Sequence, residues 1–192
     1  MILSNVEIVS AIKSGVFNIS PFAGMDPTQS PFNTSAVDLR LRDKIQIPKP
    51  GPAAFDLRKP DIASFLDRNS EILQITDDQP FPLKPNRFIL GQTIELVDFP
   101  LRPGQRCYSA RVEGKSSIAR TGIIVHFTAP TIHAGYKGPI TLELINLGPM
   151  DFLLYPRMFI CQLIVEEVSG NPLDAPNQFK GQTNPAGIVP HS

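Results

Sequence analysis

Hydrophobic and polar residues alternate along much of the chain with the period of two that is typical of β-strands. The alternation is clearest at 37–41, where Val37, Leu39 and Leu41 share one face while Asp38 and Arg40 fall on the other. Further runs rich in apolar and β-branched residues predict strands at 45–47, 71–76, 88–96, 107–112, 123–127, 140–145 and 159–165.

Turn-forming residues separate these runs. They occur as Lys-Pro-Asn at 84–86, Arg-Pro-Gly at 102–104, Gly-Tyr-Lys-Gly at 135–138 and Tyr-Pro-Arg at 155–157. The chain also contains 20 prolines and 13 glycines among its 192 residues, a composition that disfavours long helices. Many short strands joined by turns predict a mainly β protein, built as a distorted barrel or jelly roll.

One helix is indicated clearly, at the N-terminus. Ser4 followed three residues later by Glu7 has the form of a capping box. Apolar residues at 8, 9, 11 and 12 then form one stripe, and Gly15 provides a stop. A second, weaker helical pattern follows Pro60 at 62–67, and residues 17–33 are expected to be loop.

The length and composition narrow the possible functions. A chain of this length fits one domain, which we place at residues 1–170, followed by a mobile tail at 171–192 that closes over a site. Lys and Arg together number 18, as do Asp and Glu, so the zero net charge argues against a general nucleic-acid binder. Apolar runs fall well short of the roughly 20 residues that a membrane helix needs, and no secretory signal is visible. We therefore expect a cytoplasmic protein that binds neither nucleic acid nor membrane.

Phosphate-binding groups concentrate in the segment at 113–122. It places Gly114, the hydroxyls of Ser116 and Ser117, and the cations Lys115 and Arg120 within a few residues. Backbone N–H groups beside a glycine, hydroxyls and cationic ends are the donors that a phosphate group requires. The alternative interpretation is a polar loop between strands with two solvated cations.

A glutamate lies in the middle of the strand predicted at 140–145. Leu142 and Leu144 alternate there with Thr141, Glu143 and Ile145. A carboxylate in a dry pocket is suited to proton transfer, whereas a glutamate on a solvent-exposed strand face needs no function. Both interpretations remain open at this point.

The cysteines and histidines provide weaker signals. Cys107 and Cys161 are far apart, so neither a zinc ribbon nor a redox pair is indicated. His126 lies in the strand predicted at 123–127 and is typical of a structural histidine, and His133 precedes a Gly-Tyr turn. The His-x-Glu and Pro-Cys-x-x-Cys pattern of zinc deaminases is missing from the sequence, so a deaminase of this sequence would activate water without zinc.

Taken in order, several short motifs resemble the dCTP deaminase family of the dUTPase-like superfamily. The motifs are MILS at 1–4, SAVDLRL at 35–41, LKP at 83–85, FILG at 88–91, GKSSIAR at 114–120, VHFTA at 125–129, the Gly-Tyr-x-Gly turn at 135–138, TLE at 141–143 and QFKGQ at 178–182. The resemblance implies a dUTPase-type distorted β-barrel, a homotrimer with active sites shared between subunits, dCTP as substrate, and Mg²⁺ bound through the triphosphate rather than by protein side chains.

The resemblance also implies residue roles. Glu143 matches the catalytic glutamate, and the carbonyl of Ala129 matches a group that orients the attacking water together with Ser116 and Arg120. His126 matches a histidine that supports the site from behind. The residues matching nucleotide-binding positions are Lys115, Ser116, Ser117, Ile118, Ala119, Arg120, His133, Thr141, Leu142, Gln178, Lys180 and Gln182.

The sequence departs from the family pattern at three places. Many relatives have Asp where His133 stands, and in dUTPases the aspartate of that turn takes part in water activation and sugar recognition. Several relatives have Arg in place of Lys115, which exchanges a forked guanidinium for a point charge. A tyrosine that relatives carry in the tail is missing before Gln178.

Three functional hypotheses follow. The first is a zinc-independent deaminase that converts dCTP to dUTP and ammonia. The second is a dUTPase, or a bifunctional enzyme that forms dUMP and pyrophosphate, which His133 disfavours. The third is a nucleotide-binding or trimeric structural module without catalysis, which a glutamate beside a donor-rich loop disfavours.

Overall fold

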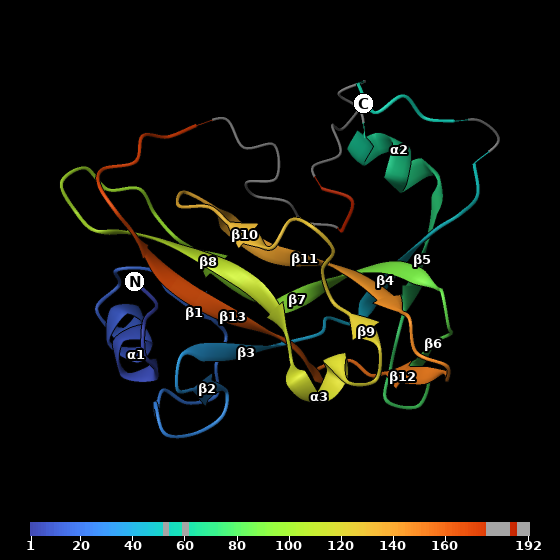
Figure 1. Cartoon of the computed structure of the whole chain (residues 1–192), viewed down its shortest axis with the longest axis horizontal. Helices are drawn as coiled ribbons and strands as arrows, with labels where there is room; N and C mark the ends of the chain where they lie inside the picture. The colour runs from blue at the N-terminus through green and yellow to red at the C-terminus, as the bar shows by residue number, and fades with distance from the viewer. Residues whose placement is uncertain (52–53, 59–61, 176–184, 188–192) are drawn as a thin grey trace.

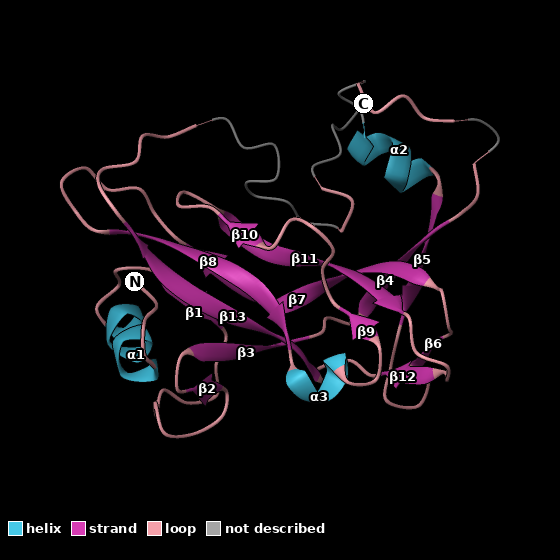
Figure 2. Cartoon of the chain, viewed as in Figure 1, coloured by secondary structure: helices cyan, strands magenta, loops and turns pink. Residues whose placement is uncertain are grey.

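The computed structural model describes residues 1–51, 54–58, 62–175 and 185–187 of the chain. Strands make up most of the regular structure, accompanied by short helices (Figures 1 and 2). Among the described residues the helices are α1 (Asn5–Lys13), α2 (Ile62–Arg68) and α3 (Ser116–Ala119). The predicted mainly β fold with a short N-terminal helix is confirmed. No helix in the described ranges has the length and apolar character required to cross a bilayer.

The strands form two large sheets and one small one. Their bounds are β1 (Asn18–Ser20), β2 (Phe32–Asn33), β3 (Ala36–Arg40), β4 (Lys44–Pro48), β5 (Ser70–Gln74), β6 (Phe81–Leu83), β7 (Phe88–Asp98), β8 (Cys107–Gly114), β9 (Ile123–Ile124), β10 (Thr131–Ile132), β11 (Lys137–Asn146), β12 (Phe152–Leu154) and β13 (Phe159–Val168). One sheet has the order β5-β4-β7-β11-β9, with β1 also paired to β7. The other has the order β10-β8-β13-β3-β2, and β12 pairs with β6.

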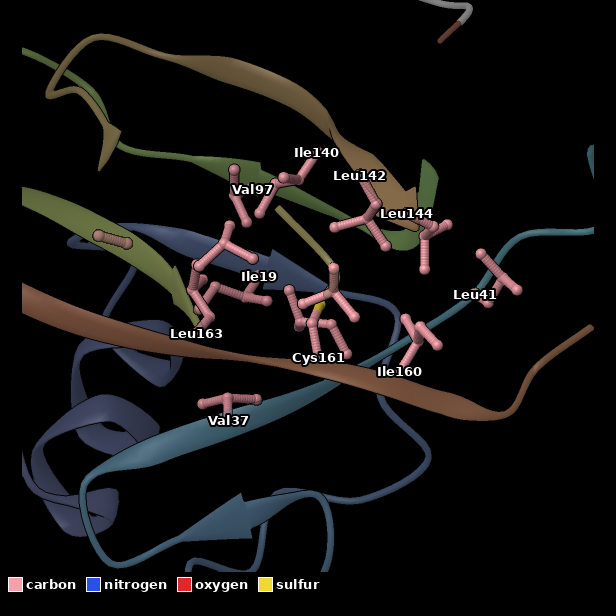
Figure 3. Close-up of a cluster of buried hydrophobic side chains, with 14 of the residues drawn as sticks. Ile19, Val37, Leu41, Val97, Ile140, Leu142, Leu144, Ile160, Cys161 and Leu163 are labelled. Atoms are coloured by element: carbon pink, nitrogen blue, oxygen red, sulfur yellow. The ribbon is translucent and has the colours of Figure 1, made fainter. Parts of the chain in front are cut away.

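The core lies between the inner faces of the two large sheets. Leu142 and Leu144 of β11 meet Cys161 and Leu163 of β13 there, and all four side chains are fully buried (Figure 3). Burying each leucine contributes about 1.5–3 kcal/mol. Because successive residues of a strand point to opposite faces, the burial of Leu142 and Leu144 turns Glu143 to the outer face of its sheet.

A buried ion pair also links the two sheets. The carboxylate of Glu95 on β7 is fully buried and accepts hydrogen bonds from the backbone N and the Nε of Arg40 on β3, at 2.8 and 2.6 Å. These bonds supply the partners that a buried carboxylate requires. Next to it β7 and β11 change register, and the hydroxyl of Thr93 accepts the N–H of Ile140 at 3.0 Å to satisfy the irregular backbone.

Helix α1 follows the local signals of its sequence. The hydroxyl of Ser4 accepts the N–H of Glu7, and the carboxylate of Glu7 accepts the N–H of Ser4 at 2.9 Å, so both halves of the predicted capping box are present. The two hydrogen bonds from Ser4 lower the pKa of the Glu7 carboxyl. Gly15 follows the helix with φ of 70°, the left-handed conformation that glycine adopts most readily.

Two sequence predictions need correction. Residues 17–33 were expected to be loop but contain β1 and β2; their partners β7 and β3 are distant in sequence, and prolines and asparagines surround such short strands. The strand expected at 123–127 stops after Ile124. Beyond that point the N–H of Phe127 donates to the side chain of Glu143 and not to a neighbouring strand.

The two cysteines are expected to be unreactive in the folded protein. Cys161 is fully buried and Cys107 is 3% exposed, and neither forms a disulfide. Burial, with the nearby carboxylates of Glu95 and Asp38, raises the pKa of the Cys161 thiol, so little thiolate is available to react. A colorimetric thiol titration at pH 8 should detect no reactive thiol in the native protein and two after denaturation. Rapid reaction of the native protein would contradict the described packing.

Candidate active site

The candidate site is built around Glu143, in the middle of β11. The buried leucines on either side of it fix the strand, and the glutamate is partly exposed on the opposite face. Its Oε2 accepts the backbone N–H of Phe127 at 2.9 Å, which fixes the carboxylate at one oxygen. In the part of the chain that the structure describes, no protein donor bonds to Oε1. The backbone therefore holds one oxygen of Glu143 and leaves the other without a protein donor among the described residues.

An aromatic contact supports this arrangement. Phe127 lies in the irregular segment between β9 and β10, and its ring packs edge-on against Phe88 of β7 with the centroids 5.8 Å apart. Phe88 pairs with Ile145 across β7 and β11, so it lies on the same sheet face as Glu143. The contact holds the Phe127 backbone where its N–H reaches the carboxylate.

A pocket of about 420 Å³ opens beside the glutamate. Its walls come from β11, the segment before β10, the turn before β11, helix α2 and the C-terminal part of the chain. The lining residues are Ile62, Leu66, Leu90, Val112, His126, Ala129, Thr131, Ile132, His133, Tyr136, Ile140, Thr141, Glu143, Pro185 and Ala186. A mostly apolar pocket with a few convergent polar groups is typical of small-molecule sites, and its volume falls within their usual range.

The structure brings several of the predicted residues together in this pocket. Ala129, His133, Thr141 and Glu143 all line it, as does His126. Nε2 of His126 lies 4.0 Å from Glu113, while its buried Nδ1 has no hydrogen-bond partner within the described residues. Leu142, also predicted to contact nucleotide, has its side chain in the core, so only its backbone can face the pocket.

The C-terminal segment forms one wall. Pro185 and Ala186 are buried against the pocket, and the hydroxyl of Thr141 donates to the carbonyl of Pro185 at 3.4 Å. The predicted tail residues Gln178, Lys180 and Gln182 lie outside the described residues. Their assigned role and the mobility of the tail remain predictions.

The predicted phosphate loop has a different location. Ser116, Ser117 and Arg120 are exposed on and directly after α3, while Ile118 packs toward the core. The ammonium of Lys115 points inward and forms an ion pair with Asp38. Figure 1 shows α3 at the lower edge of the molecule and α2, which borders the pocket, near the upper edge. None of the loop residues 114–120 is among the described residues that line the glutamate pocket of the same chain.

The pocket contains a carboxylate, two histidines and several hydroxyl groups, but none of its described lining residues is Lys or Arg. Similarly, no cluster of three or more His, Cys, Asp or Glu side chains within the described ranges is arranged to hold a metal ion. The described pocket of one chain thus offers polar groups for a neutral ring but no lysine or arginine for a polyanion.

Comparison with known proteins identifies the family. The sequence profile of proteins described as dCTP deaminase-like matches residues 2–168. The chain belongs to the dCTP deaminase-like family. The resemblance seen in the short sequence motifs is thereby confirmed over most of the chain.

Curated relatives of this dCTP deaminase-like protein include proteins of two names. The "dCTP deaminase, dUMP-forming" of Dictyoglomus thermophilum is 37% identical over 177 residues, which cover 92% of this chain and 84% of the relative. The protein of the same name from Methanothermobacter thermautotrophicus is 35% identical over 96% of this chain and 91% of its own. The "dCTP deaminase" of Thermomicrobium roseum is 35% identical, with the same coverage.

The fold is shared with a solved member. The crystal structure of 2'-deoxycytidine 5'-triphosphate deaminase from Agrobacterium tumefaciens matches 85% of this chain with a TM-score of 0.64 at 19% identity. This chain covers 47% of the length of that protein. The match shows a common fold for this dCTP deaminase-like protein.

Sequence reasoning missed several parts of the site. It did not place Ile62 and Leu66 of α2 at the pocket, because an amphipathic helix gives no indication of which sheet face it covers. It also missed Tyr136, which lines the pocket. The hydroxyl of Tyr136 donates to the carbonyl of Pro139 at 2.5 Å and so ties the turn to the start of β11. The Gly-Tyr-x-Gly motif was the available signal for this last residue.

Proposed function

We propose that this protein hydrolyses dCTP to dUTP and ammonia, with Glu143 as the proton-transferring group. The observation that carries the proposal is a carboxylate that is fixed at one oxygen by the Phe127 N–H and lines a pocket of about 420 Å³, large enough for a nucleobase. The names of the three relatives described above, each a dCTP deaminase, support this choice of substrate.

The reaction needs one group that both accepts and donates protons. Glu143 takes a proton from water, and the resulting hydroxide attacks C4 of cytosine. The carboxylic acid then protonates N3, giving a tetrahedral carbon that bears a hydroxyl and an amino group. Transfer of the hydroxyl proton through Glu143 to the amino group breaks the C4–N bond and releases ammonia. Ala129 lies in the pocket wall, and we assign its carbonyl to orient the water.

The triphosphate requires positive charge that the described pocket of one chain does not provide. The exposed Ser116, Ser117 and Arg120 offer hydroxyls and a guanidinium, but none of them lines the Glu143 pocket of the same chain. We therefore assign the phosphate contacts to the loop of a neighbouring copy in a homotrimer. In this arrangement each site combines the glutamate pocket of one subunit with the α3 loop of the next.

Magnesium fits this assignment as an ion carried by the substrate. Mg²⁺ commonly keeps several waters and is bound through substrate phosphates with few protein ligands. Within the described ranges, no three or more His, Cys, Asp or Glu side chains are grouped so that they could hold a metal ion. When bound, the ion neutralises phosphate charge, while water activation depends on Glu143.

A second candidate function is direct conversion of dCTP to dUMP. It is favoured by the name of the relatives from Dictyoglomus and Methanothermobacter, which are dUMP-forming. It is disfavoured by His133, which lines the pocket and occupies a sequence position where many relatives have an aspartate. An imidazole at this position does not provide the carboxylate that dUTPases use on this turn.

Product analysis tests both candidates. The purified protein is incubated with dCTP or with dUTP in the presence of Mg²⁺, and nucleotides, ammonia and pyrophosphate are quantified. The proposed reaction gives one ammonia and one dUTP per dCTP, with dUTP left intact. Equal amounts of dUMP, ammonia and pyrophosphate from dCTP establish the bifunctional reaction. Binding of dCTP with no ammonia release refutes catalysis and favours a nucleotide-binding module.

Mixing two inactive variants tests the shared site. Arg120→Ala removes the loop cation and Glu143→Gln removes the proton carrier, so each variant alone is expected to be nearly inactive. In trimers reassembled from equal amounts, a site is intact when its pocket comes from the first variant and its loop from the second. This predicts recovery of about a quarter of wild-type activity. Recovery no greater than the sum of the separate variants would place both residues in one subunit.

A further inference from the structure

Lys115 lies in the predicted phosphate loop, yet its side chain does not point to solvent. Its ammonium pairs with Asp38 of β3, and the side chain of Lys115 is 22% exposed while that of Asp38 is 10% exposed. The same ammonium lies 5.7 Å from the centre of the Phe159 ring. The other oxygen of Asp38 accepts the side-chain N–H of Asn33 at 2.9 Å. The lysine is therefore held by the buried carboxylate of Asp38, which is itself fixed by the hydrogen bond from Asn33.

The backbone of Lys115 forms the start of α3. It is the N-cap residue, and its carbonyl accepts the N–H groups of Ile118 and Ala119 at 3.0 and 2.8 Å. Ile118 packs toward the core on the same inner side. Two inward residues thus hold a single helical turn whose hydroxyls and Arg120 are exposed.

We propose that Lys115 and Asp38 are positioning residues for the substrate-phosphate loop, and that Arg120, not Lys115, supplies its cation to the phosphates. A lysine that moved outward to a phosphate would leave the carboxylate of Asp38 buried without its cation, which is strongly unfavourable. Keeping the pair intact instead fixes where the loop begins and so how its three exposed groups are presented. This inference rests on the proposed dCTP reaction and adds a role for Asp38, for which the sequence motifs implied none.

The test compares Lys115→Met, Asp38→Asn and the double variant in steady-state deamination of dCTP, well below each melting temperature. If both residues act by positioning, each single variant raises KM about tenfold and changes kcat much less, and the double variant is no worse than either single one. Lys115→Arg, which can keep the ion pair, should stay near the wild-type KM. Lys49→Met is the matched control, because Lys49 forms an exposed pair with Glu71 at 3.3 Å away from the loop.

Two results would overturn the proposal. If Lys115→Met raises KM while Asp38→Asn leaves it unchanged or lowers it, the lysine contacts phosphate directly. If the variants melt earlier but keep the wild-type KM, the pair serves stability alone. Asn33→Ala covers the case in which Asp38→Asn does not fold, since it loosens Asp38 without removing a charge, and the proposal expects a smaller rise in KM. Calorimetric dCTP affinities of the same variants separate this test from the proposed reaction, because they can be measured even if the wild type releases no ammonia.

Discussion

Glu143→Gln should lower ammonia release from dCTP by at least about a thousandfold while leaving the fold intact. The amide keeps the size of the side chain, and its oxygen can still accept the Phe127 N–H that Glu143 Oε2 accepts at 2.9 Å. It cannot take up a proton, so neither water activation nor protonation of N3 can proceed through it. The measurement is kcat for ammonia release, together with the melting temperature and the affinity for dCTP.

The matched control is Glu71→Gln. Glu71 is on β5, at the edge of the same sheet, and is 53% exposed in its pair with Lys49. Glu71→Gln should retain the wild-type kcat for ammonia release from dCTP. Turnover by Glu143→Gln within tenfold of the wild type would assign proton transfer to a different group; His126, His133 and Tyr136 are the other titratable residues among those that line the described pocket.

Gly122→Ala should destabilise the protein by about 3 kcal/mol or more. Gly122 follows α3 with φ of +90°, and a Cβ there would lie 2.5 Å from the backbone nitrogen of Gly148. Backbone atoms cannot yield as the end of a flexible side chain can, so the contact between the loop and the turn after β11 must open. Thermal unfolding should show a midpoint lower by about 10 °C.

Gly170→Ala separates the two causes of the lower stability, which are the strain of a positive φ and the close approach to Gly148. Gly170 has a similar φ of +84°, but a Cβ there would meet no atom within 4 Å. It should cost only the backbone strain of about 1–2 kcal/mol. If both variants lost the same stability, the close approach of Gly122 to Gly148 would contribute nothing, contrary to the geometry.

The parts of the fold that sequence predicted well are those with strong local signals. The capping box at Ser4 and Glu7 and the alternation around Leu142 both depend on near neighbours in the chain, and both are present in the structure. β1 and β2 were missed because short strands are determined by partners far away in sequence, as in the pairing of Ile19 with Val97.

The candidate site likewise has parts that the sequence predicted and parts that it did not. Glu143 and the loop from Lys115 to Arg120 were found from residue types and motif order, and the structure places Glu143 at a pocket. The orientation of Lys115 was not predictable, because its partner Asp38 comes from another strand 77 residues earlier. Similarly, no local signal indicates that the Phe127 N–H, and not a strand ladder, bonds to the glutamate.

The alternation of buried and outward-facing residues along β11 limits the insertions and deletions that this strand can accept. Adding or removing one residue between Thr141 and Leu144 would turn a leucine to the pocket side of the sheet. It would also turn the carboxylate of Glu143 into the hydrophobic core. Length changes there are compatible with function only in pairs, unless a bulge absorbs the odd residue. Natural or engineered variants of this strand should therefore keep its alternation even where side chains other than that of Glu143 differ.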